Sequence, residues 1–222
     1  MNFRLDAAIK AHLLTKPDTG DATTFLSSLN KGLHDCRKAT DRDLSTGQRL
    51  DPGEHDSWVG ALGYLALLDH IGTCFTRVDR HSAGQSHEDN PIVSALRAFS
   101  DLEGDEVTAL YALRCAFAHD FSLCNAHESK PELRHCFRLL PDVDEPLVTM
   151  PKKRWDGDYS NRPPECWTSV GLTLLGDLVE DICAQLPQLH RDGKLKLKLK
   201  GGADELYHRY TVRKAVKALK NS

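Results

Sequence analysis

The chain has 222 residues, of which 40% are apolar and 27% are charged, and its formal net charge at pH 7 is −3. This composition is that of a globular protein and excludes an intrinsically disordered chain. The longest apolar run, Trp58 to Leu68, falls short of the ~20 residues of a membrane span, and the first residues contain no apolar signal core. Seven cysteines without framework spacing favour reduced thiols. We therefore expect a cytoplasmic protein with no membrane partner.

The charge is distributed unevenly along the chain. Residues 190–222 contain ten Lys or Arg and three acidic residues, a net charge of +7, which leaves −10 for residues 1–189. An acidic body followed by a basic segment suggests an anionic partner, although a solvated surface gives the same pattern. We predict a domain over 1–189 and a basic C-terminal extension over 190–222, packed on the domain or tethered to it.

Hydrophobic periodicity predicts a mainly α protein, a bundle of about four or five helices. The segment from Ser57 to about Val78 is apolar nearly all round, which is typical of a central helix. Five other helices are predicted. The first starts near Asp21 or Thr23 and ends after Cys36, the second starts at Pro91 with Asn90 as its cap, and the third starts after Asp105 and ends near His119. The last two cover 165–186 and 203–220. Short alternating segments at about 121–150 predict a small antiparallel β insertion.

The most informative segment is the apolar helical run that contains Arg114 and, five residues later, His119. Arginine remains charged and presents a fork of donors that suits a phosphate, and histidine is the side chain best suited to move protons near neutral pH. Cleavage of a phosphodiester needs both properties. The alternative is that Arg114 forms a surface ion pair, with Asp120 or Glu106, and that His119 is only the polar end of a helix.

Arg114-x4-His119 in a mostly helical chain resembles the motif of the HEPN superfamily (higher eukaryotes and prokaryotes nucleotide-binding domain). That motif is an arginine, four to six residues, and a histidine at the C-terminal end of a core helix. The resemblance implies a HEPN-like bundle and a dimeric, metal-independent endoribonuclease of a toxin or phage-defence system. Arg114 would stabilise charge on the phosphate, and His119 would be the general acid or base. RNA, a second copy of the chain and an antitoxin are the partners this implies.

One departure from the family pattern defines an alternative function. The family usually places a polar residue, often asparagine, directly after the arginine, where this chain has Cys115. The alternative is a non-catalytic HEPN-like module that binds RNA, a nucleotide or a protein partner.

Two basic segments are candidates for RNA binding, because cations interleaved with aromatic or apolar side chains suit a single strand. They are Lys152, Lys153 and Arg154 beside Trp155, and the alternating residues Lys194, Lys196, Lys198 and Lys200. The competing interpretation makes Leu195, Leu197 and Leu199 a docking strand for another protein.

Two further clusters have weaker chemical signals. Cys124, His127, His135 and Cys136 contain zinc-ligand types, but adjacent His135 and Cys136 point to opposite sides of a strand, so we expect no metal and no cofactor. Asp69 and His70 on the central helix are a candidate buried acid–base pair. The alternative is that they only mark the edge of this helix that faces solvent.

Overall fold

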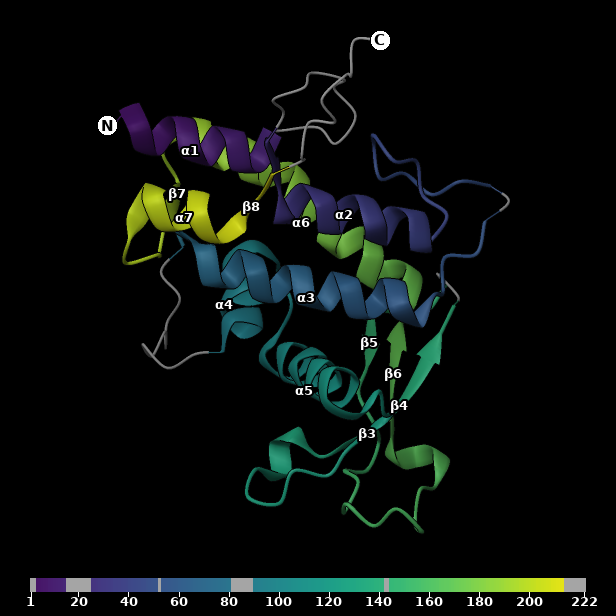
Figure 1. Cartoon of the computed structure of the whole chain (residues 1–222). Helices are drawn as coiled ribbons and strands as arrows, with labels where there is room; N and C mark the ends of the chain where they lie inside the picture. The colour runs from purple at the N-terminus through teal and green to yellow at the C-terminus, as the bar shows by residue number, and fades with distance from the viewer. Residues whose placement is uncertain (1–2, 15–24, 52, 81–89, 142–143, 214–222) are drawn as a thin grey trace, which may run out of the picture.

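The computed structural model describes residues 3–14, 25–51, 53–80, 90–141 and 144–213, and this part of the chain is mainly helical (Figure 1). Its seven α-helices are α1 (Phe3–Leu14), α2 (Ser28–Ala39), α3 (Trp58–Cys74), α4 (Pro91–Phe99), α5 (Gly104–Asp120), α6 (Leu172–Arg191) and α7 (Gly202–Tyr210). The mainly α prediction is confirmed. The predicted number of four or five helices is too low, because the sequence pattern does not predict α1 and because the C-terminal α7 also packs into the fold.

Helix α3 is the centre of the fold, and α2, α4, α5 and α6 all pack against it (Figure 1). The Ser57 side chain caps its first turn by accepting a hydrogen bond from the Gly60 backbone. Most of its circumference is buried, as its nearly continuous apolar sequence predicts. A Cβ atom at Gly72 would lie 1.7 Å from the Pro91 carbonyl oxygen, so only glycine permits this close approach of α3 and α4.

The helix ends follow local capping rules. Pro91 begins α4 and Asn90 caps it, as predicted. The predicted cap of α5 was wrong: Glu103, not Asp105, occupies the N-cap, where it forms a capping box with Glu106. Helix α5 ends one residue after His119, close to the predicted end.

The strands form two ribbons and one small sheet. The strands are β1 (Phe25–Ser27), β2 (Phe75–Arg77), β3 (Cys124–Asn125), β4 (His135–Leu140), β5 (Val148–Thr149), β6 (Trp167–Gly171), β7 (Leu195–Leu197) and β8 (Thr211–Arg213). β1 pairs with β8 and β2 with β7, both antiparallel. The four-stranded sheet has the order β3-β4-β6-β5.

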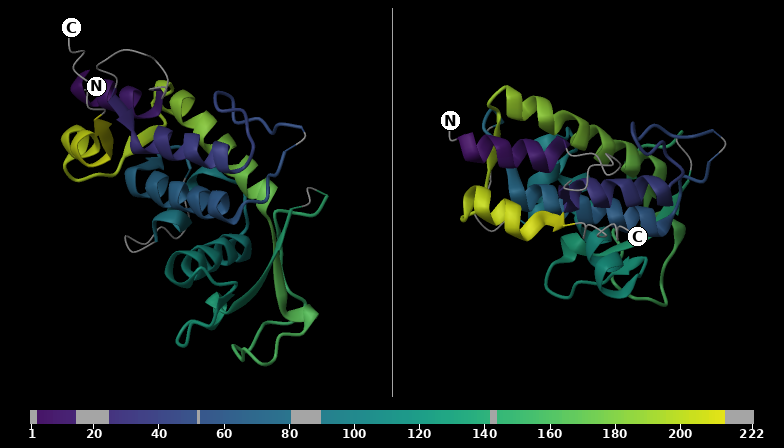
Figure 2. Two further views of the ribbon diagram at one scale, coloured as in Figure 1. Left: turned by 45° about the vertical axis from the view of Figure 1, so that its right-hand side comes forward. Right: turned by 45° about the horizontal axis from the view of Figure 1, so that its top comes forward.

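The predicted β insertion at 121–150 is present, but it is not wholly antiparallel. Strand β6 inserts between β4 and β5 and runs parallel to β4. The predicted helix over 165–186 was wrong at its start, because Thr168 and Val170 are buried while Trp167 and Ser169 are less so, the alternation of a strand. Helix α6 then continues directly from β6 (Figure 2).

The described part of the basic C-terminal segment packs on the N-terminal half of the chain. β7 pairs with β2, α7 packs on α1, and β8 pairs with β1. Leu195 and Leu206 are buried in the main core. The predicted helix over 203–220 ends at Tyr210, and residues 214–222 lie outside the described part of the chain.

None of the helices in the described ranges combines the length and apolar composition that a bilayer crossing requires.

Candidate functional site

Arg114 and His119 border one partly exposed strip of α5. Between them around the helix lie Tyr111, Cys115 and Ala118, which are all at least partly exposed. At 100° per residue these five positions span about 140°, with ~7.5 Å of rise between Arg114 and His119. The remaining circumference of this stretch packs into the core. The helix therefore presents the two predicted catalytic residues at opposite edges of one surface, not in contact with each other.

An ion pair with α3 positions Arg114. Its Nε donates to Oδ2 of Asp69 at 2.5 Å, and the arginine side chain retains 29% of its surface exposed. The alternative partners expected from the sequence, Asp120 and Glu106, are therefore not the ones in this pair. The other Asp69 oxygen, Oδ1, is buried and has no hydrogen-bond partner among the described residues. One of the five guanidinium N–H donors is thus committed to Asp69, and the carboxylate fixes the direction of the fork.

His119 lies in the last turn of α5 and is exposed. Beyond it, Phe121 ends the helix in the left-handed region at φ 49°, and the Ser122 N–H donates to the Ala116 carbonyl oxygen. This geometry directs the chain away from the helix immediately after the histidine. His119 is consequently accessible to a ligand from solvent.

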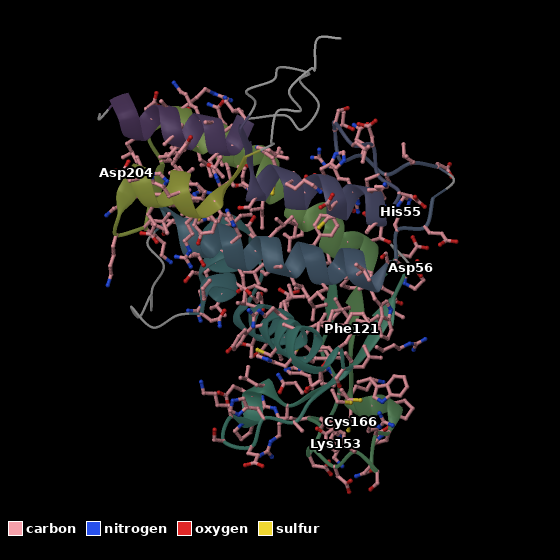
Figure 3. The ribbon with its side chains drawn as sticks, in the orientation of Figure 1. His55, Asp56, Phe121, Lys153, Cys166 and Asp204 are labelled. Carbon is pink, nitrogen blue, oxygen red and sulfur yellow. The ribbon has the colours of Figure 1, made fainter. Side chains whose placement is uncertain are left out.

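Exposed aromatic side chains lie at the same end of α5. The ring of Phe121 lies 5.9 Å from that of Trp58 and 5.5 Å from that of Phe117, centroid to centroid. Trp58 and Phe121 are 39% and 47% exposed, and Figure 3 shows Phe121 near the α5 terminus. The sequence did not identify either as a candidate ligand-binding residue, because Trp58 fits the apolar stripe of a helix and Phe121 lies at the start of a predicted short strand.

The pair Asp69 and His70 does not act as one acid–base unit. Asp69 binds Arg114, whereas His70 turns to α1 and shares a 3.0 Å hydrogen bond, Nε2 to Nε2, with His12. The two imidazole planes are within 5° of parallel, and their centroids lie 5.1 Å apart, so the rings meet end to end. Burial lowers the pKa of His12 to about 3 and that of His70 to about 4. Both rings are neutral at physiological pH, which makes them a structural pair.

The predicted RNA-binding residues form two separate surfaces. Lys152, Lys153 and Arg154 are exposed in the loop after β5, at the lower end of the molecule in Figure 3. The lysines at 194, 196, 198 and 200 lie along and beside β7, at the other end in Figure 1. The structure therefore does not bring the two basic segments together.

Around β7 the lysines and leucines alternate between solvent and core. Lys194 contacts Asp79 at 3.5 Å, and Lys198 donates to the Gly72 carbonyl oxygen, while Lys196 and Lys200 are exposed. The intervening leucines, Leu195, Leu197 and Leu199, pack on the protein's own core. Their apolar faces are consequently occupied within the chain, which disfavours the docking-strand interpretation.

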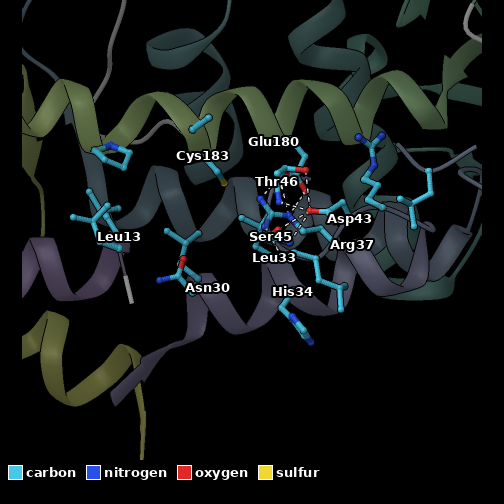
Figure 4. Close-up of a pocket in the computed structure, with 17 residues that line it drawn as sticks. Leu13, Asn30, Leu33, His34, Arg37, Asp43, Ser45, Thr46, Glu180 and Cys183 are labelled. Atoms are coloured by element: carbon cyan, nitrogen blue, oxygen red, sulfur yellow. Dashed lines mark hydrogen bonds and ion pairs between the residues drawn. The ribbon is translucent and has the colours of Figure 1, made fainter. Parts of the chain in front are cut away.

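A groove of about 640 Å³ between α2 and α6 is a feature that the sequence does not indicate (Figure 4). At its base Nε and Nη2 of Arg37 donate to the Glu180 carboxylate, whose Oε1 also accepts from the Tyr64 hydroxyl. The backbone of Leu44, in the loop that closes one end, accepts another bond from Arg37. The Arg37–Glu180 pair is therefore satisfied within the protein, and leucines of α1 and α2 line the groove together with polar residues such as Asn30, His34 and Asp43.

The candidate zinc residues are divided between two sides of β4. His135 bonds to the Thr168 hydroxyl and the Glu132 carbonyl oxygen, and His127 is exposed. Cys124 and Cys136 face each other in a separate small cluster. Across the described residues, no group of three or more His, Cys, Asp or Glu side chains is arranged to hold a metal ion.

Comparison of the chain with protein-family models, with curated proteins and with solved structures finds no match.

Proposed function

We propose that this protein is a metal-independent endoribonuclease of the HEPN type. The observation that supports the proposal is the α5 surface strip, which has an accessible imidazole at one edge and an oriented guanidinium at the other. The 2′-hydroxyl of the RNA attacks the adjacent phosphate. His119 takes up or delivers the proton, and Arg114 stabilises the negative charge that develops on the phosphate oxygens.

Asp69 is a positioning residue in this mechanism. By accepting from Nε of Arg114, it holds the guanidinium against α3 and leaves the other edge of the fork for a phosphate. It also places a negative charge beside the cation, which weakens anion binding by Arg114 alone. A second cation near the same phosphate is therefore favourable.

A homodimer supplies that second cation. Two copies of the α5 strip facing each other across a two-fold axis bring two arginines and two histidines to one groove. Cys115 and Ala118, two of the three residues between the edges of the strip, are small and allow two α5 helices to approach closely at their level, whereas the larger Tyr111 lies one turn earlier. Light scattering at micromolar concentration tests this arrangement, and a strictly monomeric protein would remove it.

The cleavage test uses the full chain and single-stranded RNA in the presence of a chelator. We expect His119→Ala and Arg114→Ala each to reduce cleavage by at least ~10²-fold, the range of a missing general acid–base group. His208→Ala, an exposed histidine on α7, is the matched control and should retain activity. Asp69→Asn keeps the shape of the side chain but loses its charge, and it should change the rate without abolishing it. Cleavage that survives both alanine substitutions would reject the proposal.

A second candidate is a non-catalytic HEPN-like module that binds RNA, a nucleotide or a protein. The Arg114–Asp69 ion pair favours it, because an arginine whose charge is partly neutralised stabilises the developing negative charge less well. Cys115 also favours it, since it occupies the position where the family usually has a polar residue. Binding of RNA without turnover, unaltered in His119→Ala, would support the module. Growth arrest on induction in a bacterial host, abolished in His119→Ala, would support the toxin role and the search for an antitoxin.

RNA binding by the basic surfaces is tested separately from cleavage. Truncation after Leu189 would remove Leu195 and Leu206 from the core, so lysine substitutions are the appropriate perturbation. Lys196 and Lys200 are exposed, and their replacement by glutamine should flatten the slope of log affinity against log salt. The expected change is ~0.7 for each phosphate that is no longer neutralised. An unchanged slope would exclude this surface as the RNA site.

A further inference from the structure

Three of the seven cysteines lie in one small core with Trp155, apart from the main core of the helical bundle. Cys124 on β3 and Cys136 on β4 have their sulfur atoms 3.4 Å apart, and Cys166 belongs to the same cluster. Figure 3 shows Cys166 at the lower end of the molecule, close to Lys153. These thiols have no part in the proposed cleavage reaction.

Backbone register places Cys124 and Cys136 directly opposite each other in an antiparallel pair. The Phe137 N–H donates to the Leu123 carbonyl oxygen at 2.7 Å, so the neighbouring positions form the hydrogen-bonded pair and the cysteines the non-hydrogen-bonded one. Cα atoms in such a pair lie about 4.5 Å apart, which is within the ~4.4–6.8 Å range of disulfides. A disulfide therefore needs a rotation of side chains and no rearrangement of strands.

The surroundings of the two thiols differ. The exposed guanidinium of Arg162 reaches Cys124, with Nη1 3.8 Å from the sulfur. Burial raises the pKa of the Cys136 thiol to about 11, with a further contribution from Cys124. Cys124 is also the more accessible of the two, with 9% of its surface exposed against 3% for Cys136. Cys124 is thus suited to attack first and Cys136 to attack second.

We infer that Cys124 and Cys136 form a reversible disulfide when the protein meets a peroxide. The Cys124 thiolate attacks one peroxide oxygen, which gives a sulfenic acid and releases hydroxide. The Cys136 sulfur then attacks the Cys124 sulfur, forms the S–S bond and displaces a second hydroxide. The two thiol protons convert both hydroxides to water, so two thiols lose two electrons and one hydrogen peroxide is reduced to two water molecules. A dithiol reductant reverses the reaction.

The cross-link would fasten the segment that follows α5. Between His119 and Cys124 the chain contains only the helix end and one short turn, in which the Ser122 hydroxyl accepts from the Cys124 N–H. A bond from β3 to β4 would hold this turn to the central strands of the small sheet. Oxidation would then restrict the segment next to the exposed histidine.

The experiment uses the full-length protein, treated with a few equivalents of hydrogen peroxide and then alkylated. Before alkylation, we expect the mass of the intact protein to be lower by two hydrogen atoms than that of the untreated protein. After alkylation, peptide mapping should find Cys124 joined to Cys136. In Cys136→Ser the reaction should stop at a sulfenic acid on Cys124, which dimedone traps. In Cys124→Ser no disulfide of this pair can form, and Cys136 should not be oxidised. Cys74→Ser, at a buried cysteine of α3, is the matched control and should form the same disulfide.

The peptide map of the peroxide-treated protein that carries no substitution tests the inference directly. A folded protein whose seven thiols all remain free after peroxide treatment would overturn it. A disulfide from either cysteine to Cys166 would also overturn it. Stoichiometric zinc in the purified protein, absent in Cys124→Ser, would instead identify the three cysteines as ligands of a metal.

Discussion

The hydrogen-bonded imidazoles of His12 and His70 should make this protein sensitive to mild acid. His12 lies on α1 and His70 on α3, and the edge of Tyr210 from α7 packs on both rings. Phe75 adjoins His12, and Cys74 and Arg209 are close to His70. Because burial lowers both pKa values far below 6.5, the unfolded chain binds protons in a range where the folded chain does not.

The sign and size of the effect follow from proton linkage. Stability is fully present above about pH 6.5 and falls as the pH drops from there toward the folded pKa values of about 3 and 4. One pH unit below its ordinary pKa, each histidine stabilises the unfolded chain by about 1.4 kcal/mol, so the pair contributes about 3 kcal/mol at roughly pH 5.5. Protonation of both rings would also replace their N–H···N bond by two opposed donors.

The assay is urea unfolding followed by circular dichroism at about pH 7.5 and about pH 5.5, which gives the free energy of unfolding at each pH. In His12→Phe the loss on acidification should be smaller by roughly 1.4 kcal/mol than in the unmodified protein. His208→Phe, at an exposed position, should leave the loss unchanged. If the unmodified protein and His12→Phe lost the same free energy, the buried neutral pair would not be the cause.

Two further substitutions test the packing of the helices. Gly72→Ala should destabilise the protein by about 1–3 kcal/mol or more, measured by urea unfolding, because its methyl group would overlap the Pro91 carbonyl oxygen of α4. Glu180→Gln should cost about 3 kcal/mol, since it leaves Arg37 without its charge partner in a site where the two side chains are only 14% and 9% exposed. Asp35→Asn, at an exposed ion pair, is the control and should cost below ~1 kcal/mol. Equal costs for the two acidic residues would contradict the burial argument.

The helices were predictable where a cap and a long apolar stripe agree. Ser57 and Asn90 cap the helices that follow them, and their apolar faces meet the core. The start of α6 was not predictable in this way, because Trp167, Val170 and Leu174 match helical spacing although residues 167–171 form a strand. Residues 167–171 form a strand because they pair with the parallel strand β4, which lies about thirty residues earlier in the chain.

The candidate site was predictable only in part. The sequence placed Arg114 and His119 on one helix and His119 near its end, which the structure confirms. It did not identify Asp69 as the partner of Arg114, because an ion pair between α3 and α5 depends on how two helices cross. The same limit applies to His12 and His70, and to the two opposed cysteines, whose partners are set by tertiary packing and strand register.

The pairing of β1 with β8 has a consequence for synthesis of the chain. Phe25 lies opposite Arg213, so the backbone of β1 gains its ladder partner only after residues 211–213, almost 190 residues later in the chain, have left the ribosome. The contacts of helix α1 with α7, and of His12 with Tyr210, likewise form only after the later residues have been synthesised. Long-range closure of this kind is slow, and it leaves an early strand edge exposed to other nascent chains. We expect α1 and β1 to be the last N-terminal elements protected from hydrogen exchange during refolding.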